Sequence, residues 1–164
     1  MMRDVDRTVE PARDPAEVAE RMFSWMHRAR RLVDSRLAEL NLTMPRMKML
    51  GKLGDGPCQQ NRLAGAFDLA PRTVTEIVDG LEKAGLVERV TDPNDRRAKL
   101  VHLTDAGRAA YEGARVAKQE IIADLLGSLS PAELAELGTL FDQLHCSFDD
   151  KALDLTRPAT KTPA

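Results

Sequence analysis

The feature that most constrains the fold is a change of apolar period within residues 70–104. Up to Gly85 the apolar residues recur at three- and four-residue steps, which is typical of a helix with one buried face. Gly85 is placed to end that helix in the left-handed conformation. Two short alternating segments, 86–91 and 98–103, then flank a turn rich in Asp, Pro and Asn. A helix joined directly to a two-stranded hairpin is therefore expected.

Helix-start signals divide the rest of the chain into further helices. Segments 14–17 (DPAE) and 130–133 (SPAE) each combine an N-cap residue, a proline suited to the first helical position and an acid that can complete a capping box. Thr43 and Thr104 are expected to cap two more helices, and a short helix is predicted over 59–67. The order predicts a mainly α protein with a small β-hairpin wing that follows a helix-turn-helix.

The same patterns predict how the chain is organised. Residues 1–13 are polar, charged and without periodicity, so a disordered arm is expected, and the Thr- and Pro-rich residues 151–164 predict a flexible tail. Residues 43–103 would form the winged helix-turn-helix domain. The flanking helices in 14–42 and 104–150 have apolar stripes but no large core of their own. A two-fold partner copy is the simplest cover for those stripes, so both segments are expected to serve dimerisation.

Charge and cysteine content narrow the class of protein. The net charge is −2, but residues 43–104 hold 10 basic and 8 acidic residues, so the central block is mildly basic and suits phosphate contact. No apolar run approaches the roughly 20 residues that span a bilayer. The N-terminus lacks the apolar core of a secretion signal. With only two cysteines, a cytoplasmic, reducing compartment and no membrane partner are expected.

The segments around the hairpin resemble the MarR (multiple antibiotic resistance regulator) family. The stretch DPNDRRAKLVHLT, residues 92–104, is similar to that family's wing, and APRTVTEIVDGLEKAGLVERV before it is similar to the family's recognition helix and first wing strand. In helix order the resemblance covers about residues 18–148. The wing pattern Asp-x-Arg-x-x-x-Val-x-Leu-Thr is met by Asp95, Arg97, Val101, Leu103 and Thr104.

The resemblance implies a homodimeric transcriptional regulator, more often a repressor than an activator, that binds double-stranded operator DNA of pseudo-palindromic sequence. The first, fifth and sixth helices would build the dimer interface. The fourth would enter the major groove, and the wing tip the adjacent minor groove. No cofactor and no enzymatic activity are expected. Members of the family often respond to small phenolic or aromatic ligands, or to thiol oxidation.

The paired arginines of the turn have the chemistry expected of a minor-groove contact. A guanidinium is flat, permanently charged and weakly hydrated, so Arg97 is expected to enter a narrow minor groove. Arg96 would contact a backbone phosphate, and Asp95 would hold the wing or orient the arginine. The alternative is a solvated turn whose charges pair locally, since exposed pairs contribute only about 0–1 kcal/mol. The helix-turn-helix that precedes the turn favours DNA contact as the role of these arginines.

The helix before the hairpin carries six polar residues opposite or beside its apolar stripe, namely Arg72, Thr73, Thr75, Glu76, Asp79 and Lys83. Arg72 is expected to read guanine, and Glu76 to accept a hydrogen bond from cytosine. Thr73 and Thr75 would contact bases, thymine methyl groups or phosphate. The alternative is a solvated helix face, and that interpretation is preferred for Asp79 and Lys83.

Outside this helix, Arg46 and Arg62 are candidate phosphate contacts, although plain exposure explains each of them equally well. Two residues depart from the family's pattern. Ala70 stands where a small polar residue often caps the helix, and losing such a cap costs about 1 kcal/mol. Glu76 stands where a basic residue is common, and an acid there weakens nonspecific attraction to phosphates.

Regulation by a ligand is suggested by a concentration of methionines around the single tryptophan. Methionine-rich surfaces adapt to varied ligands, whereas methionine at helical spacing is also ordinary core. Cys58 and Cys146 keep a thiol-based redox sensor as an alternative. The candidate ligand pocket consists of Met22, Trp25, Met26, Met44 and Met47.

Two other function classes fit the sequence less well. A winged-helix module that binds protein would need an exposed apolar face on the helix before the hairpin and no paired arginines. An enzyme would need paired carboxylates, a nucleophile elbow, a phosphate-binding Gly-rich loop or metal-ligand spacing, and the sequence shows none of these. The three histidines, His27, His102 and His145, are scattered, so no metal site is predicted.

Overall fold

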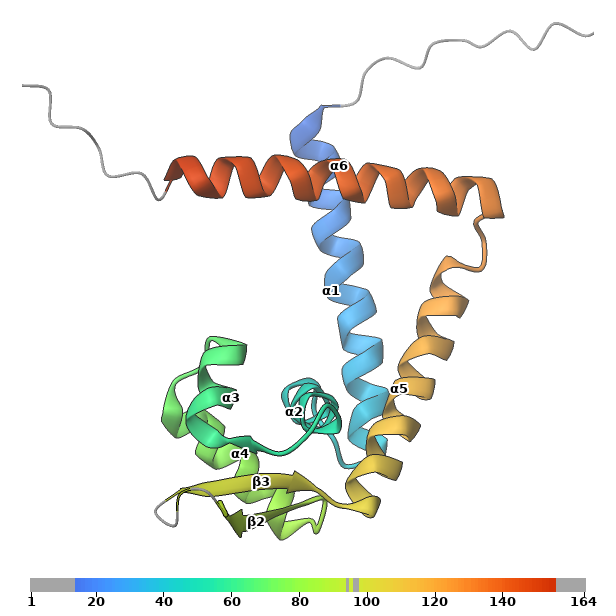
Figure 1. Cartoon of the computed structure of the whole chain (residues 1–164). Helices are drawn as coiled ribbons and strands as arrows, with labels where there is room; N and C mark the ends of the chain where they lie inside the picture. The colour runs from blue at the N-terminus through green and yellow to red at the C-terminus, as the bar shows by residue number, and fades with distance from the viewer. Residues whose placement is uncertain (1–13, 94, 96–97, 156–164) are drawn as a thin grey trace, which may run out of the picture. The chain divides into compact units, whose positions relative to one another are not determined.

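Figure 1 shows the computed structural model of the chain, which describes residues 14–93, 95 and 98–155, with side chains described up to residue 147. The expected arm at 1–13, the end of the expected tail at 156–164, and Arg96 and Arg97 lie outside the described residues. In the described part the elements are α1 (Pro15–Glu39), α2 (Met44–Gly54), β1 (Cys58–Gln59), α3 (Gln60–Phe67), α4 (Pro71–Lys83), β2 (Val87–Thr91), β3 (Lys99–Leu103), α5 (Asp105–Leu126) and α6 (Pro131–Leu155).

The chain divides into two compact units, Met1–Ile121 and Ile122–Ala164. The first unit holds the elements from α1 to β3 and most of α5, and the second holds the end of α5 and α6. The mainly helical architecture with a small sheet confirms the fold class expected from the sequence. Helix α6 continues to Leu155, into the segment expected to be a tail. None of the described helices is long and apolar enough to cross a membrane.

The core of the first unit combines one face from each of several helices. Helix α4 contributes Val74, Val78 and Leu81, each with 0% exposed surface, as the three- and four-residue steps predict. Helix α1 enters the core only near its C-terminal end, through Val33 and Leu37. The rest of this buried cluster comprises Leu42, Met47, Met49, Leu50, Leu53, Leu63, Ala64, Val87, Val101 and Ala114.

The wing belongs to a three-stranded antiparallel sheet with the strand order β1-β3-β2. Strands β2 and β3 pair from Val87↔Leu103 to Thr91↔Lys99, so each begins one residue later than the sequence predicted. Strand β1, which pairs Cys58 and its neighbour with β3, was expected to be a loop and a helix start. A two-residue strand is too short to show alternation, which is why the pattern did not predict it.

Several of the helix-terminal signals act as predicted. Asp14 Oδ1 accepts a hydrogen bond of 3.0 Å from Ala16 N at the start of α1. At the start of α6, Glu133 Oε2 accepts from Ser130 N at 2.7 Å, and Ser130 Oγ accepts from Glu133 N at 3.4 Å, which completes the capping box. Gly85 has a φ of 70° and ends α4 in the left-handed conformation.

The end of the wing is fastened to the start of α5. Thr104 Oγ1 donates to Gly85 O at 2.8 Å and accepts from Gly107 N at 3.0 Å, so it caps α5 as predicted and also ties the helix to the turn after α4. The approach is close, because a Cβ atom on Gly107 would lie 2.0 Å from Leu86 O. Thr43 precedes α2 as expected but makes no side-chain capping hydrogen bond.

Two long helices keep large apolar side chains on their surface. On α1, Phe23 is 62% exposed and Leu32 is 51% exposed. On α6, Leu140 and Leu144 are 50% and 56% exposed, and none of the side chains described on this helix is buried. Apolar area of this kind gains roughly 25 cal/mol per Å² when a partner removes it from water.

Candidate nucleic-acid interface

Helix α4 packs its apolar face into the core and therefore presents its polar face to solvent. Arg72 Nε donates to Glu76 Oε1 at 3.1 Å, and these side chains are 90% and 66% exposed. An exposed pair one helical turn apart contributes only about 0.3–0.5 kcal/mol, so either partner can exchange the other for a DNA group at little cost. The two residues expected to read bases therefore lie together on the most accessible part of the helix.

The two threonines expected beside them differ in the bonds they make. Thr75 Oγ1 donates to Pro71 O at 3.0 Å and accepts from Gln60 Nε2 at 3.3 Å. Because its one donor hydrogen is already used, Thr75 offers DNA its methyl group and a remaining acceptor lone pair, and no donor for a phosphate. Thr73 is exposed on the same helix.

Arg89 of strand β2 forms a cluster that the sequence did not indicate. Its Nη2 donates to Asp79 Oδ1 at 2.5 Å, its Nη1 donates to Glu82 Oε2, and its Nε donates to Gln60 Oε1 at 3.1 Å. The Arg89 backbone N also donates to Glu82 Oε1 at 3.2 Å. Asp79, expected to be a plain solvated residue, is therefore one end of a link between α4 and the wing.

Electrostatics favour the charged form of this arginine. Burial by itself would lower the pKa of Arg89, but the hydrogen bonds and the negative charges of Asp79 and Glu82 outweigh it, and the pKa is raised above its ordinary value. The side chain of Arg89 is only 19% exposed, against 59% for Asp79 and 40% for Glu82. Arg89 is therefore the buried partner of this cluster, and the carboxylates of Asp79 and Glu82 lie nearer to solvent.

The base of the wing turn is anchored by a buried carboxylate. Asp92 is 8% exposed, and its Oδ2 accepts a hydrogen bond of 3.0 Å from Gln59 Nε2 of β1. Asp95, expected to support the wing, is exposed, and its backbone N donates to Asp92 O at 3.3 Å while Ala98 N donates to Asp95 O at 2.9 Å. No local sequence pattern predicts this hydrogen bond, because Gln59 and Asp92 lie 33 positions apart.

The basic residues expected on α2 and α3 lie in different surroundings. Arg46 is half-buried, and its guanidinium lies against Gly80 of α4, where an added Cβ would be 2.3 Å from Nη2. It therefore packs α2 on α4 as well as carrying charge. Arg62 is exposed on α3.

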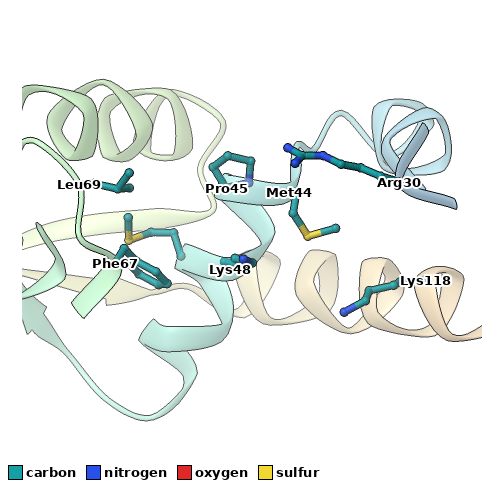
Figure 2. Close-up of a pocket in the computed structure, with 8 residues that line it drawn as sticks. Arg30, Met44, Pro45, Lys48, Phe67, Leu69 and Lys118 are labelled. Atoms are coloured by element: carbon teal, nitrogen blue, oxygen red, sulfur yellow. The ribbon is translucent and has the colours of Figure 1, made fainter. Parts of the chain in front are cut away.

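A pocket of about 430 Å³ opens in the first unit, close to the predicted methionine cluster. Figure 2 shows side chains from α1, α2 and α5 around it, together with Phe67 and Leu69 from the end of α3 and the residues after it. Three cations, Arg30, Lys48 and Lys118, border the apolar surface. The full lining is Arg30, Met44, Pro45, Lys48, Met49, Phe67, Leu69 and Lys118.

Only part of the predicted ligand-pocket set lines this region. Met44 lines this pocket, and both Met44 and Met47 line a neighbouring one of about 340 Å³. Met22, Trp25 and Met26 line neither of these two pockets, and Trp25 and Met26 are 46% and 48% exposed. Their part of α1 precedes the segment that enters the core.

The two cysteines are free thiols in different settings. Cys58 is half-buried in β1, and its Sγ lies 3.6 Å from Gln59 O, whereas Cys146 is exposed on α6. Among the described residues, no group of three or more His, Cys, Asp or Glu side chains is arranged to hold a metal ion.

Comparisons with known proteins point to one family. The model of the MarR family matches residues 42–99, from the residues before α2 to the start of β3. The uncharacterized HTH-type transcriptional regulator YsmB of Bacillus subtilis is 35% identical over 89 residues, which are 54% of this chain and 60% of YsmB. The match thus spans less than two thirds of that relative's length.

Solved structures extend the likeness over most of the chain. A probable transcriptional regulator from Pseudomonas aeruginosa is 32% identical with a TM-score of 0.63, and the match covers 78% of this chain and 96% of that one. A mutant MarR from E. coli, complexed with operator DNA, is 25% identical with a TM-score of 0.63, covering 78% of this chain and 93% of that one.

Proposed function

This chain belongs to the MarR family of winged helix-turn-helix transcriptional regulators, and we propose on that premise that it represses transcription as a homodimer bound to a pseudo-palindromic operator. The observation that carries the proposal is the polar face of α4. Arg72 and Glu76 stand exposed there, opposite the buried residues Val74, Val78 and Leu81, and the helix leads through a tight turn into the wing. That is the arrangement by which a recognition helix enters the major groove.

Base reading would come from the first turns of α4. On meeting DNA, Arg72 would exchange Glu76 for the O6 and N7 acceptors of guanine, and Glu76 would accept from a cytosine amino group. Thr73 and the methyl group of Thr75 would add contacts to bases or thymine methyl groups. Arg62 would neutralise a phosphate, with Arg46 doing so from its place against Gly80. From the sequence pattern, Arg97 would enter the minor groove, Arg96 would contact the backbone and Asp95 would support the tip.

Dimerisation would use the apolar faces that the single chain leaves in water. Phe23 and Leu32 on α1, and Leu140 and Leu144 on α6, are each at least half exposed. They fall within 14–42 and 104–150, the two segments that we assign to the dimer interface. A two-fold interface places the same surface of each copy against the other, and it would set two α4 helices for two half-sites of one operator.

A small aromatic anion is the ligand class that the pocket fits best as an inducer. The volume of about 430 Å³ lies within the range of roughly 300–1,000 Å³ typical of small-molecule sites. Phe67, Met44 and Leu69 supply apolar surface, and Arg30, Lys48 and Lys118 supply positive charge from three helices. A ligand that draws these cations together would shift α2, on which α4 rests through Arg46, and would thereby lower the affinity for DNA.

The test is a footprint of the purified protein on DNA upstream of its own gene, across a salt series, compared with Arg72→Ala. A symmetric footprint with half-sites about one helical turn apart is expected for the wild type. Arg72→Ala should lose protection at the operator and keep weak, salt-sensitive binding to any DNA. Failure of the wild type to bind DNA of any sequence at low salt would refute the proposal and favour a protein-binding module.

A further inference from the structure

Three secondary-structure elements meet at the guanidinium of Arg89. The arginine comes from strand β2, Asp79 and Glu82 come from α4, and Gln60 comes from the first turn of α3. Each of the three guanidinium nitrogens donates to a different one of these side chains. A planar fork with fixed angles holds three acceptors at set positions, which a lysine ammonium cannot do.

Gln60 carries this link to the DNA-facing end of α4. Its Oε1 accepts from Arg89 Nε at 3.1 Å, and its Nε2 donates to Thr75 Oγ1 at 3.3 Å. Thr75 in turn donates to Pro71 O at 3.0 Å, in the first turn of the helix. One continuous set of hydrogen bonds therefore runs from the middle of β2 to the turns of α4 that present Arg72 and Glu76.

We infer that Arg89, acting with Gln60, is a positioning residue for DNA reading, which locks α4 and the wing strand β2 into a single rigid unit. The inference rests on the proposed function, because it assigns a role within the same DNA-binding surface. Arg89 itself is not expected to contact DNA, since its side chain is 19% exposed and its nitrogens are engaged. Its contribution is to fix the angle at which the exposed residues of α4 meet the bases.

Such a lock affects specific and nonspecific binding differently. Reading base edges requires that helix and wing reach two grooves at once, so a change in their relative angle costs contacts. Nonspecific binding depends on the number of phosphates neutralised, which a charge-conserving substitution leaves unchanged. The ratio of the two affinities therefore separates positioning from a general effect of charge or stability.

The experiment compares Arg89→Lys with the wild type on an operator duplex and on a scrambled duplex of the same length, by fluorescence anisotropy across a salt series. Operator affinity should fall about tenfold, while scrambled-DNA affinity stays within about twofold and the salt slope is unchanged. Gln60→Leu, which leaves the Arg89 ion pairs in place, should show the same selective loss at about threefold. Thermal unfolding of each variant checks that the protein is folded at the assay temperature.

The matched control is Lys52→Arg, which also conserves charge, because Lys52 pairs with Asp55 at the C-terminal end of α2 and is not among the proposed DNA contacts. It should match the wild type on both duplexes. Equal affinities of Arg89→Lys and wild type, or an equal loss on both duplexes, would overturn the inference. Should Arg89→Lys fail to fold, Gln60→Leu decides alone by the same criterion. If the wild type does not distinguish operator from scrambled DNA, the proposed function fails first, and the variants are not needed to show it.

Discussion

Helices α4 and α1 are both amphipathic, yet their apolar stripes have different fates. On α4, Val74, Val78 and Leu81 are 0% exposed, whereas on α1 only Val33 and Leu37 near the C-terminal end are buried. The winged region therefore completes its core within one chain. The earlier part of α1 leaves large apolar side chains such as Phe23 and Leu32 exposed to solvent. The same sequence period thus identifies a core in one place and, by our proposal, a subunit interface in the other.

The largest effect is expected where the winged region packs against α5. Gly107→Ala would put a Cβ atom 2.0 Å from the backbone oxygen of Leu86, and a backbone atom cannot move aside as a flexible side chain can. We expect the free energy of unfolding to fall by at least about 3 kcal/mol, measured by urea denaturation. The control is Gly113→Ala in the same helix, where nothing lies within 4 Å, and there stability should stay equal or rise by up to about 1 kcal/mol. Equal effects of the two substitutions on the free energy of unfolding would show that Gly107 does not pack closely against Leu86 O.

The second prediction tests the two kinds of apolar stripe directly. Leu50→Ala removes a side chain with 0% exposure and should cost about 2–5 kcal/mol at any protein concentration. Leu32→Ala removes a side chain with 51% exposure, so its cost should depend on dimer formation and appear as a loss of the concentration dependence of Tm. Thermal unfolding at several protein concentrations measures both. A concentration-independent cost for Leu32→Ala would argue that α1 is covered by its own chain.

The sequence predicts contacts that repeat locally along one helix, and it does not predict polar contacts between different elements. The steps of three and four residues located the buried face of α4, because burial within one helix repeats locally. Arg89 was missed because its partners lie 7, 10 and 29 positions away, and strand alternation says only which side a residue faces. Strand β1 was missed because two residues carry no period. Long-range polar contacts of this kind are set by the fold and leave no local pattern.

The candidate ligand pocket shows the limit in another way. The predicted lining was chosen because methionines gather around the single tryptophan, and residue type alone does not distinguish a pocket lining from a subunit interface. The predicted residues were Met22, Trp25, Met26, Met44 and Met47. The structure places Met44 and Met47 at pockets and leaves Trp25 and Met26 on the open part of α1. The bordering cations Lys48 and Lys118 were not part of the prediction: Lys48 lies beside Met47 in α2 but carries no methionine or aromatic signal, and Lys118 comes from α5, far from α2 in the sequence.

The third prediction concerns that pocket, using benzoate as a simple aromatic anion. Benzoate should weaken operator binding by the wild type, and Lys118→Met should raise the benzoate concentration needed by about tenfold, because one of three cations is lost. Fluorescence anisotropy of labelled operator in a benzoate titration measures both. Lys83→Met, which removes a lysine outside the pocket, should leave the benzoate response unchanged. A response of Lys118→Met equal to that of wild type would place the ligand elsewhere.

The smallest effect is expected at the start of α6, where local capping can be examined apart from buried contacts. The backbone N–H and the hydroxyl of Ser130 both donate to Glu133 and lower its pKa below the ordinary value. A carboxylate whose pKa is lower in the folded state stabilises that state above its unfolded pKa, and the contribution is lost as the pH falls through the folded pKa. Glu133→Gln should therefore reduce Tm slightly at pH 7, and the difference from wild type should shrink as the pH is lowered below about 4. Thermal scans of both proteins over that pH range measure this difference in Tm, and the exposed Glu136→Gln serves as the control. A difference that persists at low pH would mean that Glu133 acts through packing at the subunit interface and not through the cap.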